Sequence, residues 1–364
     1  MSKARRPIEI LALAALAAPL APLAPFAHVE AQHPKVLVIY DMEGISGVIR
    51  PPYERYGAPE YPMGREALTA DVNAAIRGLK AGGAGPIWVE DGHGSGNSNE
   101  PDILVDKMDR NASFEFRTRR YDPYSTGIDG SIDAIVCIGM HARARTRGFM
   151  AHTFTFDVAW NVNGVDLTET HIVALSAARW GIPVIMVSGD NVLKDQLTAD
   201  FPELEYAVVK EAKGVSAADA VPRPEADQRI ETAARTAMQK FLAGKFRPYY
   251  LPGPYDFRLS FRTAEEGRMA AGTRGVAEDG PLGVRFGTPT YIDGYTIATD
   301  VIGHALNPLP LLIRVVTHQP GGDAIMKQWE DLIWKQIDPD SLPAWSLPPA
   351  SPATAQGKRY YGDQ

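Results

Sequence analysis

Short apolar runs that alternate with helical patterns constrain the fold of this chain more than any other feature of its sequence. The runs cover residues 36–40, 87–89, 134–138 and 183–187. Each is a continuous stretch that contains Val or Ile, which is typical of a strand buried on both faces of a parallel sheet. After the first run, Leu68, Val72 and Ile76 recur at helical spacing, and Gly82 ends that pattern. The alternation predicts an α/β fold, with a three-layer domain built on a mainly parallel sheet.

The breaks along the chain predict two domains and a tail. A long amphipathic helix at 224–243 is followed by a stretch with prolines and glycine, which indicates a linker. Apolar and polar residues then alternate from Phe257 onward, as in a strand covered on one face only. We therefore expect an α/β domain at 32–243, a smaller α+β domain at 244–337, and a Pro-rich, disordered tail at 338–364.

The first 31 residues have the pattern of an export signal. Lys3, Arg5 and Arg6 form a positive region, an apolar run at 10–18 follows, and small residues further on suit cleavage. The apolar run is too short, and too closely followed by prolines, for a comfortable membrane span. We expect a signal peptide at 1–31 and a periplasmic or secreted protein with no stable membrane insertion after processing. The alternative is that the segment is retained as an anchor.

Composition excludes one class of partner. The net charge of −7 and the lack of a basic stripe with interleaved aromatic residues argue against binding of nucleic acid. Cys137 is the only cysteine, so the chain can form no intramolecular disulfide. A hydrophobic content of 45% is ordinary for a globular chain with a sizeable core.

Carboxylates and imidazoles follow the predicted strands at the points where the strands end. Asp41 and Glu43 come after the first run, His93 after the second and His141 after the third. In open α/β sheets, ligands bind just beyond the carboxyl ends of the strands. Asp41 and Glu43 are two residues apart, so in an extended chain they point to the same side and repel unless a proton or a cation separates them. Because carboxylate oxygen and imidazole nitrogen suit zinc, this pattern predicts a metal site. The alternative is a polar strand end that leads into a turn, with capping or solvated histidines.

Five blocks of the sequence resemble one family in their order and approximate spacing. The blocks are Asp41-Met42-Glu43-Gly44-Ile45-Ser46-Gly47, Asp91-Gly92-His93, Gly139-Met140-His141-Ala142-Arg143, Met150-Ala151-His152 and Glu169. Together they are similar to the dinuclear-zinc D-aminopeptidases, which are D-amino-acid-specific metallo-aminopeptidases, over about Val36 to Val316. The chain departs from the family at Ile39, where the family usually has Ser, and in its export signal, because family members are often cytoplasmic. Both departures leave the substrate less defined than the metals.

The resemblance implies two zinc ions per subunit, held by Asp41, Glu43, His93, His141 and Glu169. In the family the first Asp bridges the two ions, which gives Asp41 that role. Glu43 and His93 would complete the ligands of one ion, and His141 and Glu169 those of the other. The negative charge of three carboxylates offsets most of the positive charge of two divalent cations and leaves a net positive field.

The resemblance also assigns a catalytic residue, His152, which corresponds to a family histidine near the metals that is implicated in the catalytic step. The alternative for His152 is a hydrogen bond within its own loop. Asp91 precedes His93 by two residues, so it would either orient that imidazole or cap a turn. His171 follows Glu169 by two residues, and we expect it to be structural.

The function that follows from the resemblance is that of a zinc-dependent aminopeptidase. It would use a metal-activated water to remove the N-terminal residue, a D-amino acid such as D-Ala, from short peptides or amides. The expected partners are a small peptide substrate and further copies of the chain in a homo-oligomer. Two alternatives remain open: a periplasmic protein that binds a metal or small ligand without catalysis, and a related metallohydrolase that acts on another amide or ester.

Overall fold

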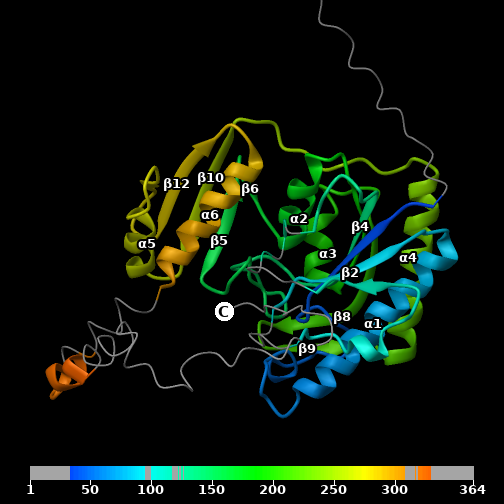
Figure 1. The fold of residues 1–364 in the computed structure, drawn as a ribbon, viewed down its shortest axis with the longest axis horizontal. Helices are drawn as coiled ribbons and strands as arrows, with labels where there is room; N and C mark the ends of the chain where they lie inside the picture. Colours follow the sequence, from blue (N-terminus) through cyan, green and yellow to red (C-terminus); the bar gives the residue numbers. More distant parts are fainter. Residues whose placement is uncertain are drawn as a thin grey trace, which may run out of the picture. The chain divides into compact units, whose positions relative to one another are not determined.

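A seven-stranded sheet forms the centre of the part of the chain that the structure describes (Figure 1). Its strands are β1 (Val36–Tyr40), β2 (Ile87–Asp91), β3 (Ser113–Phe114), β4 (Ala134–Met140), β7 (Val184–Asp190), β8 (Glu205–Gly214) and β9 (Ala217–Ala220). They lie in the order β3-β2-β1-β4-β7-β8-β9. Neighbouring strands are parallel, except for the antiparallel pair β8 and β9. The predicted mainly parallel sheet is confirmed.

The computed structural model describes residues 33–94, 100–116, 122, 124–125, 127–307, 316 and 319–328. The predicted signal peptide at 1–31 and the predicted tail at 338–364 lie outside these residues, and both stay predictions. Among the described residues, no helix combines the length and the apolar character that a membrane crossing needs.

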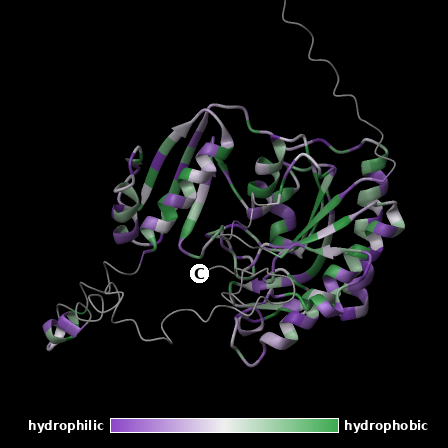
Figure 2. Ribbon diagram, in the orientation of Figure 1, coloured by the Kyte–Doolittle hydropathy of each residue, from purple (hydrophilic) through white to green (hydrophobic). Residues whose placement is uncertain are grey.

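Helices cover both faces of the main sheet because alternate residues of its strands are buried on opposite sides. The helical elements around it are α1 (Tyr61–Gly82), α2 (Glu169–Ala178), α3 (Asn191–Leu197), α4 (Arg223–Leu242) and the 3-10 turns η1 (Pro51–Tyr53) and η2 (Val105–Lys107). Val36 and Val38 of β1 are buried in a cluster with residues of α1 and α4. Leu37 and Ile39 are buried in another cluster with residues of α2 and α3. Figure 2 shows the hydrophobic residues concentrated in the strands between these helices, which is the expected three-layer arrangement.

A separate five-stranded antiparallel sheet has the order β11-β12-β10-β5-β6. Its strands are β5 (Val158–Val162), β6 (Val165–Asp166), β10 (Tyr255–Phe261), β11 (Ala277–Glu278) and β12 (Gly283–Thr288), accompanied by α5 (Ala264–Ala271) and α6 (Tyr291–Ala305). The turn between β5 and β6 has Asn163 and Gly164 at positive φ, as the hairpin signal Asn-Gly requires. Because β5 pairs with β10, the smaller sheet takes strands from both sides of residue 243. The boundaries of the predicted domains stay a prediction.

Candidate metal centre

The chain turns sharply after β1, and this turn carries the first two candidate ligands. Asp41 and Glu43 are each 3% exposed. Their loop crosses the end of β4, where the backbone N–H of Gly44 donates to the carbonyl oxygen of Gly139 over 2.7 Å. A Cβ atom on Gly44 would lie 2.0 Å from Met140 O, and Gly139 has a φ of +80°. Glycine is required at both positions, because a larger residue would block the approach of the two loops or strain the backbone.

Asp41, Glu43 and His93 form one group whose potential ligand atoms all lie within 4.8 Å of one another. His93 follows β2, which is the parallel neighbour of β1, so the ends of the two strands bring these side chains to one place. The ring nitrogen Nε2 of His93 lies 3.8 Å from Oε1 of Glu43. The structure thus brings together the residues that follow the first two predicted strands.

A second group of the same kind consists of Asp41, His141 and Glu169. Nε2 of His141 lies 3.3 Å from Oδ2 of Asp41 and 3.2 Å from Oε2 of Glu169. Nδ1 of His141 donates to the carbonyl oxygen of Ala142 over 3.0 Å, which leaves Nε2 to face the carboxylates. Asp41 belongs to both groups, as a bridging ligand would. Which of these residues binds which ion stays a prediction.

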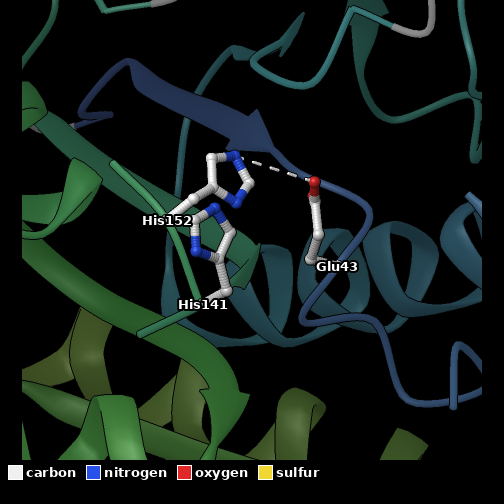
Figure 3. Close-up of side chains that lie close together, drawn as sticks. All are labelled: Glu43, His141 and His152. Atoms are coloured by element: carbon white, nitrogen blue, oxygen red, sulfur yellow. Dashed lines mark ion pairs between the residues drawn. The ribbon is translucent and has the colours of Figure 1, made fainter. Parts of the chain in front are cut away.

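His152 lies against the same cluster, and with Glu43 and His141 it forms a third group whose potential ligand atoms lie within 4.8 Å of one another. Its ring stacks on that of His141, with 4.0 Å between the ring centroids (Figure 3). Its Nε2 lies 3.6 Å from Glu169 Oε1 and 3.9 Å from Glu43 Oε1. Nδ1 lies 2.8 Å from Met150 O, so it carries the proton and Nε2 offers its lone pair to the cluster. The sequence suggested either a hydrogen bond of His152 within its own loop or a position beside the metal ligands. In the structure His152 has both.

Glu169 is held in place by groups on three sides. It is the first residue of α2, whose N-cap Thr168 accepts the backbone N–H of His171. Oε1 of Glu169 accepts the backbone N–H of Phe154 over 2.6 Å. The hydroxyl of Tyr124 donates to Oε2. With His171 closing a capping box at the start of α2, its expected structural role is confirmed.

The buried carboxylates and imidazoles of the cluster shift one another's pKa values. Burial and the neighbouring Glu43 carboxylate raise the pKa of Asp41 well above its usual value. Burial acts in the same direction on the other two carboxyls and is the largest single effect, but several neighbours together outweigh it. His93, with Asp41 and two further imidazoles, lowers the pKa of Glu43. His141, with His152 and Tyr124, lowers the pKa of Glu169 to about 2. The pKa values of both imidazoles are raised well above their usual value, although burial opposes this. In the metal-free protein, protonated His93 and His141 thus supply positive charge that a bound cation would replace.

The donor set fits divalent zinc. Three buried carboxylates and two imidazoles are oxygen and nitrogen ligands of the kind that zinc prefers. In the described part of the chain, Glu43 Oε2 is buried without a hydrogen-bond partner, and His141 Nε2 is near two carboxylates but forms no hydrogen bond. Because buried polar atoms rarely lack a partner, these two atoms point to a missing ligand.

Comparison with known proteins decides the family. The model of peptidase family M55, described as D-aminopeptidase, matches residues 35–299. The chain belongs to this D-aminopeptidase family. A relative described as "D-aminopeptidase" from Bacillus subtilis (strain 168) is 26% identical over 267 residues, which are 72% of this chain and 94% of the relative. A solved structure, described as the Zn-dependent D-aminopeptidase DppA from Bacillus subtilis, a self-compartmentalizing protease, has the same fold. It is 24% identical, with a TM-score of 0.69, over 75% of this chain and 98% of that chain.

In this D-aminopeptidase family member, the carboxylate paired with Nδ1 of His93 belongs to Asp102 and not to Asp91. Oδ1 of Asp91 accepts the backbone N–H groups of His93, over 2.9 Å, and of Gly94, over 3.0 Å, so Asp91 caps the turn. Oδ2 of Asp102 lies 2.9 Å from Nδ1 of His93. Asp102 is fully buried, and it also accepts the hydroxyl of Tyr61. Sequence reasoning missed it because it follows no strand.

A buried lysine supports the turn after β1 from behind. Lys210 on β8 is fully buried, and its ammonium group donates to the carbonyl oxygens of Glu43, over 2.5 Å, and of Val48. It also lies 4.7 Å from the ring centroid of Phe149. Burial lowers the pKa of Lys210 to about 7. The sequence signal that could have pointed to Lys210 is its charge in the middle of a strand. Lysine is almost never fully buried unless its ammonium group is paired.

Proposed function

We propose that this member of the D-aminopeptidase family is a zinc-dependent aminopeptidase. It removes an N-terminal D-residue, such as D-Ala, from short peptides or amides. The observation that carries the proposal is the convergence of the five candidate ligands at one place, where two of the three possible metal-binding groups share Asp41. The family match over residues 35–299 supports the reaction class, and the zinc-dependent relative supports the metal.

Two zinc ions would be held by Asp41, Glu43, His93, His141 and Glu169. When bound, they would supply Lewis acidity at the scissile carbonyl and make water a nucleophile near neutral pH. The backbone N–H of Met42 donates to Oδ1 of Asp41 over 2.8 Å, which fixes the orientation of that carboxylate.

His152 is suited to move a proton at Nε2. Burial and the neighbouring His141 lower the pKa of His152, which favours the neutral imidazole. Since its Nδ1–H donates to Met150 O, the lone pair of Nε2 faces the cluster and can accept a proton from the attacking water. The same nitrogen can return that proton to the departing amine.

The oligomeric state and the location of the protein are proposed on separate grounds. A homo-oligomer is supported by the description of the relative as a self-compartmentalizing protease. Export to the periplasm or the medium rests on the sequence of residues 1–31. N-terminal sequencing of the protein from its native host tests the export: a mature start near Gln32 is expected, and a start at Met1 or Ser2 would contradict it.

Metal analysis combined with a stereospecific assay tests the function. We expect the purified protein to hold about two zinc equivalents, to hydrolyse D-alanine p-nitroanilide faster than the L-isomer, and to lose activity to a chelator. A folded preparation that never holds more than one metal ion under zinc excess would refute the two-zinc site. A protein that holds two zinc ions but hydrolyses neither isomer would instead be a binding protein or a hydrolase of another amide or ester.

A further inference from the structure

A fourth acidic side chain, Glu54, lies beside the cluster without belonging to any of its metal-binding groups. Glu54 directly follows η1, and its Oε2 lies 3.3 Å from Nε2 of His93. Its side chain is 15% exposed, against 4% for Glu43 and 8% for His93. Glu54 is therefore a more exposed carboxylate than Glu43, at the edge of the cluster.

The hydrogen bonding of His93 determines what Glu54 can bind. Nδ1 of His93 is engaged by Asp102, so Nε2 is the nitrogen that remains for a metal ion. A nitrogen that gives its lone pair to a metal carries no proton, and it can no longer donate to Glu54. In the described part of the chain, His93 is the only side chain that forms a hydrogen bond or an ion pair with Glu54. With the metals bound, the Glu54 carboxylate needs another donor.

Charge and position indicate what that donor is. No lysine or arginine of the described residues pairs with Glu54, which leaves its carboxylate open to a donor on the substrate. An α-ammonium group carries three N–H donors and a positive charge, and it is two bonds away from the scissile carbonyl carbon. A carboxylate at the rim of the metal cluster can hold this ammonium while the carbonyl lies at the metals.

We propose that Glu54 binds the α-ammonium group of the N-terminal residue of the substrate. The proposal rests on the aminopeptidase function proposed above and names the residue that restricts the enzyme to free N-termini. It also gives a physical basis for stereospecificity. Once the ammonium and the carbonyl are both fixed, exchange of the side chain and the hydrogen on Cα directs the side chain to a different wall of the site.

A pair of inhibitors that differ only in the amine separates this role from others. D-alanine hydroxamate and propionohydroxamate share the metal-binding hydroxamate, and only the first carries an ammonium group. Isothermal titration calorimetry of the zinc-loaded protein gives their dissociation constants without turnover. We expect the wild type to prefer D-alanine hydroxamate by about 10- to 100-fold, the range that one hydrogen bond to a charged group supplies.

Glu54→Gln keeps the shape of the side chain and removes its charge. We expect this variant to hold two zinc ions, to prefer D-alanine hydroxamate by less than about threefold, and to lose kcat/KM by a factor similar to the lost preference. Glu66→Gln is the matched control, since Glu66 pairs with Lys107 on the surface and should keep the wild-type preference.

Two results would overturn the assignment while leaving the proposed function intact. If Glu54→Gln keeps the wild-type preference, the ammonium is bound elsewhere. If it loses a zinc ion, Glu54 is a metal ligand and not a substrate-binding residue. A wild-type protein that holds two zinc ions and hydrolyses D-alanine p-nitroanilide shows in either case that the aminopeptidase function stands. A wild type without that activity would overturn both proposals.

Discussion

Replacement of Asp102 by Asn should weaken the affinity for zinc without unfolding the protein. Asp102 is fully buried and 2.9 Å from Nδ1 of His93, and it orients the imidazole whose Nε2 faces Glu43. Asn keeps the size of the side chain, and its single oxygen can accept from Nδ1–H while its NH2 group takes the place of Oδ1 and donates to the Tyr61 hydroxyl oxygen. What is lost is the negative charge, which makes the imidazole a stronger metal ligand.

The magnitude follows from the kind of contact. Loss of a carboxylate partner behind a metal-ligating histidine typically reduces metal affinity by about 10- to 100-fold, which is about 1.4–2.7 kcal/mol. We expect a loss within this range for the ion held by His93, measured by competition with a chromogenic chelator. The melting temperature of the zinc-loaded variant should change by only a few degrees.

Asp200→Asn is the matched control for this prediction. Oδ2 of Asp200 lies 3.1 Å from Nε2 of His171, so it forms the same type of carboxylate–imidazole pair with a histidine that is not a candidate ligand. We expect Asp200→Asn to bind zinc as the wild type does. Equal zinc affinity in Asp102→Asn and the wild type, or an equal loss in both variants, would refute the reasoning that links Asp102 to the metal through His93.

Three further substitutions test the site. Asp41→Ala should lose both zinc ions, because the shared carboxylate serves both groups, and metal analysis that shows Asp41→Ala with two ions and Glu43→Ala with none would assign the bridge to Glu43 instead. His152→Ala should keep both ions and its melting temperature but lose about 10²–10⁴-fold in kcat, whereas loss of zinc would make His152 a ligand. Gly44→Ala should be destabilised by about 1–3 kcal/mol in urea unfolding, because its Cβ would meet Met140 O at 2.0 Å. Gly303→Ala is the control, since its Cβ meets nothing within 4 Å and Ala is favoured over Gly in a helix by about 1 kcal/mol; equal stability of the two variants would contradict the packing argument.

The part of the site that follows the strands could be predicted from the sequence. Asp41, Glu43, His93 and His141 come directly after β1, β2 and β4, and the parallel pairing of these strands brings their carboxyl ends together. The apolar runs identify the strands, and the sheet then fixes where the next residues lie. Glu169 was placed by the resemblance and by the start of a helix, which the structure confirms at that residue.

The part of the site that comes from loops and distant strands could not be predicted in this way. Glu54 and Asp102 reach His93 from segments 39 residues before it and 9 residues after it, and neither follows a strand. Lys210 contacts the turn after β1 although it lies 167 residues later in the sequence than Glu43. The smaller sheet presents the same difficulty, because β5 pairs with β10 through contacts such as Val162 with Phe257. Hydrophobic periodicity describes one element at a time and carries no information on such pairings.

Backbone donors help to explain how the protein keeps so much like charge in one buried place. Asp41, Glu43 and Glu169 are almost inaccessible to water, and unpaired buried charges are costly. Backbone N–H donors at Met42 and Phe154 hold two of the three carboxylates, so their geometry is set when the chain folds and not when a metal binds. A metal ion then has to displace protons from the two imidazoles and from Asp41, whose pKa is also raised, while the ligands are already in position. Metal affinity is therefore controlled as much by residues that hold the ligands as by the ligands themselves.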